Sequence, residues 1–285
     1  GEATMATASP AGKADIRKKG YMVVIRHSVR LDNDKKATWP GRNERPYDSP
    51  ICDKKLPIDQ ANVMKKKGYG GFDLIVCSPY TRCLQTAALI AKQIGVSRLR
   101  VNKSIGEVRR CVRKIQKAVW GPDKADGKVE YLSKDSMESI LKEFSDGFIT
   151  KIEPEEKPKN EGEKALGVDP EPSENDRNGK VRMMSAMRAL FRRHCVRCND
   201  RVLLVTHGDG VDAAVREFVG NGTVAYDTAE CAWGAYELEE DKILSSNKDE
   251  DAADESKENG EKSPKKKEKV SVKLAAYERF QMIKL

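Results

Sequence analysis

The sequence is poor in histidine and contains no long hydrophobic run. Histidine accounts for three of the 285 residues, and no stretch approaches the roughly 18 consecutive apolar residues that a membrane-spanning helix needs. Residues 1–19 are mainly Ala, Ser, Gly and Lys and lack the apolar core of a secretory signal. We therefore expect a cytoplasmic protein that has no membrane partner.

The chain also has too little apolar material to be packed throughout. Hydrophobic residues make up 38% of it, with six Phe, against 34% charged residues. Segments poor in apolar residues cannot offset the entropy cost of ordering. We expect a disordered tail over 1–19 and a single domain over 20–285, with mobile charged insertions at about 150–179 and 245–269.

Charge and cysteine content exclude further classes of protein. A net charge of +8 suits an anionic partner, but no aromatic-interleaved basic stripe indicates nucleic acid. The odd number of cysteines, seven, favours reduced thiols. Cys195 and Cys198 follow His194 in a CxxC pattern, but no second ligand pair stands at a spacing typical of zinc sites. Nothing in the chain indicates its oligomeric state.

Two of the three histidines stand where a short hydrophobic run stops. His27 follows the run Tyr21–Arg26, and His207 follows Arg201–Thr206. Continuous β-branched runs of this kind are typical of strands buried on both faces of a parallel sheet. Since open α/β sheets bind ligands at the carboxyl ends of their strands, we expect both histidines at one such edge.

The remaining pattern completes an α/β fold, a three-layer α/β/α sandwich with a mostly parallel central sheet. A helix is expected to begin with Asp59 as its N-cap and to end before Gly68, and another to begin at a cap formed by Ser78 or Thr81. Further strands are predicted at Phe72–Cys77 and Leu99–Val101, an antiparallel pair at Trp233–Leu238 and Val272–Phe280, and helices at Tyr131–Phe144, Lys180–Cys198 and Val211–Val219.

Three arginines accompany the histidines in these motifs. Arg26 precedes His27, Arg30 follows it, and Arg82 lies in the first turn of the second predicted helix. Guanidinium groups brought together in a partly buried site repel one another strongly, so their convergence calls for an anion. A tetrahedral phosphate fits, because arginine presents a fixed fork of N–H donors and stays charged at any working pH.

A phosphate held in this way could be attacked by a neutral imidazole, giving a phosphohistidine. The leaving oxygen then needs a proton, and Glu107 is the best-placed carboxyl group, which desolvation could keep protonated near neutral pH. His207 would donate to the phosphate oxygens and stabilise charge as it develops. This scheme requires no metal and no cofactor.

The motifs resemble those of the histidine phosphatase superfamily, also called the phosphoglycerate mutase-like family. They are Arg26-His27 followed by Arg30, then Ser78-Pro79-x-x-Arg82-Cys83-x-Gln85-Thr86-Ala87, Glu107, and His207-Gly208. Trp39, with the run 45–50 (RPYDSP), further resembles the branch containing the suppressor-of-T-cell-receptor-signalling phosphatases and ecdysteroid phosphatase. The similarity covers about 21–109 and 180–238.

The resemblance implies a phosphatase in which His27 is the nucleophile and Glu107 the general acid. It assigns the phosphate pocket to Arg26, Arg30, Arg82 and His207. The expected substrate is a phosphorylated small molecule or a phosphoprotein, with phosphotyrosine-type or other bulky phosphoesters suggested by the branch. Substrate choice would lie in Leu31–Pro57 and Gly121–Gly179.

One departure from the family pattern leaves alternatives open. The family usually has glycine after the nucleophilic histidine, whereas this chain has Ser28, whose Cβ could crowd the phosphate or be harmless. A catalytically silent phosphate-binding scaffold is therefore the main alternative. A phosphoglycerate mutase or sugar bisphosphatase is disfavoured because mutases usually carry Glu where Arg30 stands. Glu107 could instead form a surface salt bridge with Arg109 or Arg110, and Arg109 is interpreted as structural.

Overall fold

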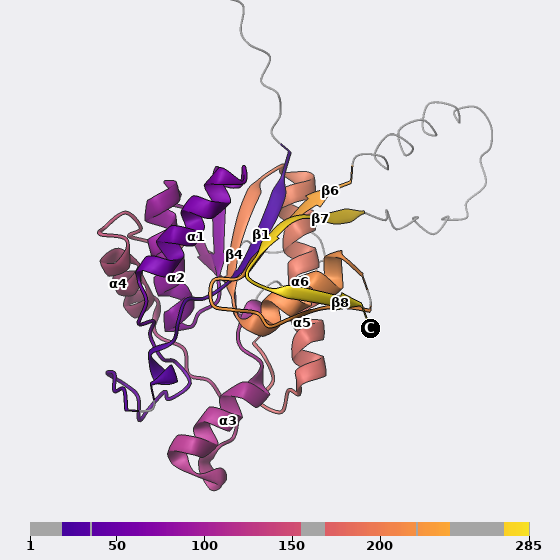
Figure 1. The fold of residues 1–285 in the computed structure, drawn as a ribbon. Coiled ribbons are helices and arrows are strands. Elements are labelled where there is room, and N and C mark those ends of the chain that lie inside the picture. The colour runs from indigo at the N-terminus through magenta and orange to yellow at the C-terminus, as the bar shows by residue number, and fades with distance from the viewer. Residues whose placement is uncertain (1–18, 35, 155–168, 221, 240–270, 285) are drawn as a thin grey trace, which may run out of the picture.

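A computed structural model describes residues 19–34, 36–154, 169–220, 222–239 and 271–284 (Figure 1). Most of the predicted tail, 1–18, and the whole of the predicted insertion 245–269 lie outside these ranges. So do residues 155–168 of the other predicted insertion. Within the described ranges, no helix is long and apolar enough to cross a membrane.

The centre of the molecule is a six-stranded sheet in the order β3-β2-β4-β1-β6-β7. The pairs β3-β2, β2-β4 and β4-β1 are parallel, whereas β1-β6 and β6-β7 are antiparallel. The strands are β1 (Tyr21–Arg26), β2 (Leu74–Cys77), β3 (Leu99–Val101), β4 (Arg201–Thr206), β6 (Trp233–Leu238) and β7 (Val272–Glu278). The predicted strands and the predicted antiparallel pair are thus confirmed.

Alternate side chains of each strand pack into two separate cores. Val23 and Ile25 of β1 lie in a core with helices α1 (Lys55–Lys66), α2 (Thr81–Ile94) and α4 (Lys134–Phe144). Met22 and Val24 lie in a second core with α5 (Asp176–Leu190) and α6 (Gly208–Phe218). Figure 1 shows these two helical layers on opposite faces of the sheet. The three-layer α/β/α sandwich with a mostly parallel sheet is confirmed.

Two helices begin where carboxylates from outside the helix can accept their first N–H groups. Helix α1 begins at Lys55, four residues before the predicted cap Asp59, because Asp53 Oδ1 accepts from the backbone N–H groups of Lys55 and Leu56 at 2.9 and 3.0 Å. Helix α2 begins at Thr81, but neither Ser78 nor Thr81 caps it. Asp48, from a distant loop, accepts from the backbone N–H of Thr81 at 2.7 Å.

Several elements were not predicted or have different bounds. Helix α3 (Arg109–Trp120) projects from the body of the fold (Figure 1). Helix α5 begins at Asp176, inside the stretch read as an insertion, and continues as the π-helix η4 (Phe191–Arg197). Strands β5 (Thr223–Tyr226) and β8 (Gln281–Lys284) form a separate antiparallel pair. Short 3-10 turns are η1 (Leu31–Asn33), η2 (Lys103–Ile105) and η3 (Pro122–Lys124).

Candidate active site

The two histidines lie side by side because their strands are parallel neighbours. Arg26 at the end of β1 is in register with Thr206 at the end of β4, and the backbone N–H of His27 donates to Thr206 O at 2.9 Å. The ring centroids of His27 and His207 are 5.4 Å apart, with an angle of 71° between their planes. Both rings are buried. The predicted convergence at one edge of the sheet is therefore confirmed.

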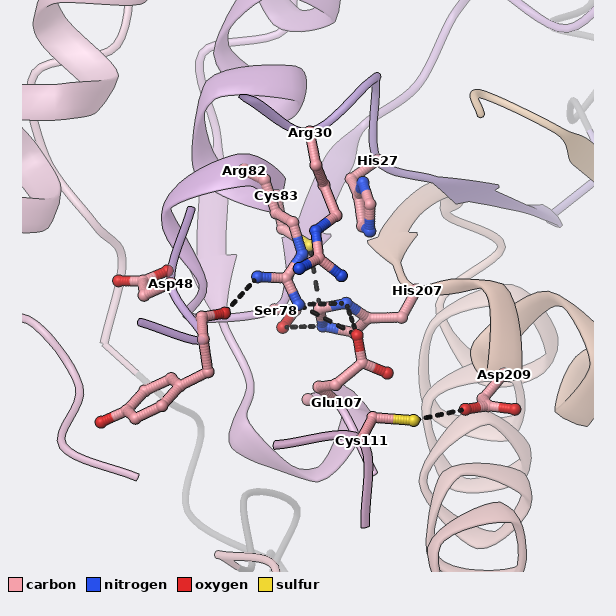
Figure 2. A network of polar contacts seen from close by, with 12 residues as sticks. His27, Arg30, Asp48, Ser78, Arg82, Cys83, Glu107, Cys111, His207 and Asp209 are labelled. Atoms are coloured by element: carbon pink, nitrogen blue, oxygen red, sulfur yellow. Dashed lines mark hydrogen bonds and ion pairs between the residues drawn. The ribbon is translucent and has the colours of Figure 1, made fainter. Parts of the chain in front are cut away.

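Arg82 enters the site from the first turn of α2 and is completely buried. Its Nη2 donates to Glu107 Oε2 at 3.0 Å and lies 3.2 Å from His207 Nδ1 (Figure 2). Its Nη1 donates to the carbonyl oxygen of Tyr47 at 2.9 Å. These contacts fix the guanidinium plane against the second histidine and the carboxylate.

His207 is held at both ring nitrogens. Its Nδ1 lies 3.2 Å from Glu107 Oε2, and its Nε2 lies 2.9 Å from Ser78 Oγ. Burial lowers the pKa of His207 to about 4, with Glu107 opposing the shift and Arg82 adding to it. The ring is therefore neutral at pH 7. Because a carboxylate only accepts, we assign Nδ1–H as the donor to Glu107 and the Ser78 hydroxyl as the donor to Nε2.

His27 has a tautomer set by the backbone. Its Nδ1 lies 2.7 Å from the carbonyl oxygen of Ser28, and since a carbonyl only accepts, Nδ1 carries the ring hydrogen. Burial and the charge of Arg82 hold the pKa of His27 well below its ordinary value of 6.5. The ring is neutral, and the lone pair is on Nε2, the nitrogen that the predicted nucleophile needs.

The charges of Arg30 and Arg26 each lower the pKa of one of the two histidines. The Arg30 guanidinium lies between His27 and Arg82 in Figure 2, and its charge contributes to the lowered pKa of His207. Asp32 holds this guanidinium, accepting from Arg30 Nε at 2.7 Å. The charge of Arg26 likewise lowers the pKa of His27.

The tip of Arg26 turns away from the histidines. Its Nη1 donates to the carbonyl oxygen of Thr228, and its Nη2 lies 3.5 Å from Glu230 Oε1. Its Nε is buried and has no hydrogen-bond partner. The structure thus brings five of the predicted residues together, namely His27, Arg30, Arg82, Glu107 and His207, and places Arg26 at their margin.

Glu107 differs from expectation in its ionisation. Burial raises the pKa of Glu107, but His207 and Arg82 outweigh it and bring the pKa well below 4.5. The carboxyl group is therefore ionised in the ligand-free site at neutral pH, and the expectation that desolvation keeps it protonated is wrong. The alternative salt bridge with Arg109 or Arg110 is also not formed, and Arg110 pairs with Asp176 instead.

Ser28 does not point its hydroxyl at the histidines. Ser28 Oγ donates to the carbonyl oxygen of Asp53 at 2.8 Å, and its backbone N–H donates to Thr86 Oγ1 at 3.0 Å. Both contacts tie the residue to the chain that leads into α1 and to α2. The Ser28 hydroxyl is therefore bound to the chain that leads into α1 and not to a histidine.

Two groups of side chains bring donor atoms close enough to consider a metal ion. The donor atoms of His27, Glu107 and His207 lie within 4.8 Å of one another. The Arg82 guanidinium, 3.0 Å from Glu107, places positive charge in that group, which suits an anion better than a cation. Glu107, Cys111 and Asp209 form the second group, where burial and Glu107 raise the pKa of Cys111 to about 12 and keep it a thiol.

The sequence analysis considered Ser78 as a helix cap and gave it no role in the site, but Ser78 contacts His207. The signal was present, because Ser78 directly follows β2, and β2 pairs with β4 just as β1 does. Away from the site, His194 Nδ1 lies 3.0 Å from Asp200 Oδ2 within and just after η4. The seven cysteines form no disulfide.

Solved structures provide the comparison. The ecdysone phosphate phosphatase from Bombix mori, in complex with tungstate, aligns with a TM-score of 0.52 at 14% identity, over 76% of this chain and 89% of that one. This chain has the histidine phosphatase fold. No family model and no curated protein matches the sequence.

Other solved structures align more loosely. Phosphoglycerate mutase from Bacillus anthracis has a TM-score of 0.43 at 13% identity, over 77% of this chain and 89% of that one. A phosphoserine phosphatase from Entamoeba histolytica has a TM-score of 0.40 at 12% identity, over 77% and 91%. The fold assignment rests on the alignment with the Bombix mori phosphatase.

Proposed function

We propose that this protein is a metal-independent phosphomonoesterase that acts through a phosphohistidine on His27. The observation that supports it most is the network around His207, in which Arg82 and Glu107 meet within 3.2 Å of Nδ1 beside the neutral His27 ring. Fixed N–H donors next to an imidazole with a free Nε2 lone pair are what attack on a bound phosphoryl group requires.

The first step forms one bond and breaks one. His27 Nε2 attacks phosphorus with its lone pair, and the bond between phosphorus and the ester oxygen breaks with its electrons on that oxygen. A phosphoryl group bound beside Glu107 brings negative charge against the carboxylate, which raises its pKa and allows it to hold the proton that the leaving oxygen takes. In the second step Glu107 accepts a proton from water, which attacks the phosphohistidine and frees His27.

The phosphate oxygens would be held by Arg26, Arg30 and Arg82, and by His207 once its Nδ1–H turns from Glu107 to the phosphate. The buried guanidinium of Arg82 is the fixed member of this set. Arg30 is already oriented by Asp32, and the unpartnered Nε of Arg26 is a buried donor that a phosphate oxygen could satisfy. Donors of this kind stabilise the charge that builds up as the leaving oxygen departs.

The substrates we propose are bulky phosphoesters, either phosphotyrosine-type groups on proteins or small molecules. The motif resemblance to the T-cell and ecdysteroid phosphatase branch supports this class, and tungstate, bound in the Bombix mori structure, is a tetrahedral oxyanion like phosphate. The seven unpaired cysteines suit a reducing compartment, so we place the activity in the cytoplasm.

The test is hydrolysis of para-nitrophenyl phosphate, with and without a chelator, by the parent and by His27→Ala. We expect activity that survives the chelator and is abolished in the variant, and an acid-labile phosphoenzyme in the parent alone. A His194→Ala variant is the matched control, because it removes the third histidine away from the site. An inert parent that still binds tungstate would favour the scaffold over the enzyme.

A further inference from the structure

A second buried guanidinium lies next to the candidate active site, joined to it by tyrosine rings. The Tyr80 ring centroid is 5.0 Å from that of His207 and 5.8 Å from that of Tyr131. Arg109, the first residue of α3, is 3% exposed, and its guanidinium carbon lies 5.8 Å from the Tyr131 centroid. The Tyr80 ring therefore packs against both His207 and Tyr131, and Tyr131 in turn lies beside Arg109.

Two polar atoms in this group are buried without a partner. Tyr80 OH and Arg109 Nη1 are inaccessible to solvent and make no hydrogen bond. The other nitrogens of Arg109 have weak partners, since Nε donates to Pro170 O at 3.2 Å and Nη2 to Tyr131 OH at 3.5 Å. An unpaired donor and an unpaired hydroxyl in the interior are unfavourable unless something binds them.

The charge of Arg109 is also uncompensated, in contrast to that of Arg82. Across the part of the chain that the structure describes, no carboxylate forms an ion pair with the Arg109 guanidinium, and Glu174, which accepts from its backbone N–H at 3.4 Å, is paired with Arg182. The Lys103 ammonium lies 5.4 Å from the Tyr131 centroid, and Asp169 neutralises it at 2.9 Å. A buried guanidinium without a counter-ion is strongly disfavoured.

We propose that Arg109, Tyr80 and Tyr131 form a second anion subsite, which binds a carboxylate or second phosphate group carried by the substrate. The proposal rests on the proposed phosphatase activity and adds a substrate class to it, phosphoesters with a second anionic group. Arg109 Nη1 offers unpaired N–H groups to a planar or tetrahedral oxyanion, and the two phenols supply O–H donors. Recognition by the subsite would select these substrates over singly charged ones.

The experiment compares kcat/KM for phenyl phosphate, para-carboxyphenyl phosphate and para-phenylene bisphosphate. We expect the parent to prefer one or both of the substrates with a second anionic group. A preference for the carboxyphenyl ester would identify a carboxylate site, and a preference for the bisphosphate would identify a phosphate site. Arg109→Gln should lower the ratio of kcat/KM for the preferred substrate to that for phenyl phosphate by about tenfold, because a charge-assisted contact is lost. Tyr80→Phe, which removes a hydroxyl and keeps the ring, should lower the ratio by a smaller factor.

Lys114→Gln is the matched control, because it removes a positive charge from the exposed side of the same helix and should leave the ratio at the parent value. A ratio that Arg109→Gln and Tyr80→Phe leave unchanged would overturn the subsite, as would a parent with no preference. If Arg109→Gln does not fold, the Tyr80→Phe ratio decides. A parent that hydrolyses none of the substrates would refute the phosphatase itself, which is a separate outcome.

Discussion

Replacing Glu107 with glutamine should separate proton donation from structural support. The glutamine oxygen can still accept from Arg82 Nη2, now 3.0 Å from the carboxylate, but the amide cannot release a proton to a leaving group. General acid catalysis contributes about 10²- to 10⁴-fold to rate. We therefore expect kcat for phenyl phosphate to fall by that factor, because its leaving group is phenoxide, a basic anion whose conjugate acid has a pKa of about 10.

A substrate with a much less basic leaving group needs little help from an acid. For 2,4-dinitrophenyl phosphate we expect the same variant to lose less than about tenfold, since the departing oxygen is stable without a proton. The variant also loses the charge that faces a fully buried guanidinium, which costs about 3 kcal/mol of stability at the lower end of the range for broken buried pairs. Rates are therefore compared at a temperature where both proteins are shown to be folded.

The measurement is steady-state hydrolysis of both esters, with thermal unfolding followed in parallel. Glu217→Gln is the matched control, because it removes a carboxylate that pairs with Arg188 in the layer of α5 and α6, on the other face of the sheet from α2. It should leave the dependence on the leaving group as in the parent. Equal losses for the two esters in Glu107→Gln would show that Glu107 shapes the site without donating a proton, and would refute the assignment.

Two further predictions concern acid stability and Ser28. The pKa of His207 is lowered to about 4 and that of His27 lies well below 6.5, so the unfolded chain binds more protons and the free energy of unfolding falls as pH drops below about 6.5. The His207 contribution reaches about 3 kcal/mol by pH 4, and urea titrations that show no loss between pH 7 and 4.5 would contradict it. Ser28→Gly should lower the free energy of unfolding by about 1 kcal/mol, because the hydrogen bond to Asp53 is lost, and should change kcat by less than about twofold. A tenfold rise in kcat would show that the Ser28 Cβ crowds the phosphate.

The strands could be predicted because their signal is local. Residues 21–26 and 201–206 are continuous apolar runs, and their burial on both faces follows from that pattern. The position of His27 and His207 at one edge then required only that the two strands be neighbours. Helix α3 was not predicted, because its apolar residues stand among many Arg and Lys residues. Val112, Ile115 and Trp120 nevertheless pack against the body along the length of the helix.

Helix starts and ionisation states depend on contacts between distant segments. The start of α2 is satisfied by Asp48, which is 33 residues away in sequence and lies in a loop with no regular pattern. The ionised state of Glu107 depends in the same way on Arg82 and His207, which are brought to it by separate elements. Burial alone predicts the opposite protonation state, and only the structure shows which charges outweigh it.

Each arginine of the cluster has a carboxylate partner within the protein, which the sequence did not indicate. From sequence, guanidinium groups gathered at one edge required an anion from outside the chain. In the folded protein each already has a carboxylate of its own: Arg82 has Glu107, Arg30 has Asp32 and Arg26 has Glu230. The ligand-free site is therefore stable without a bound ion, and a phosphoryl group must share or displace these carboxylates. Since Glu107 is the one that also contacts His207, the arrival of phosphate and the protonation of Glu107 are coupled through the same guanidinium.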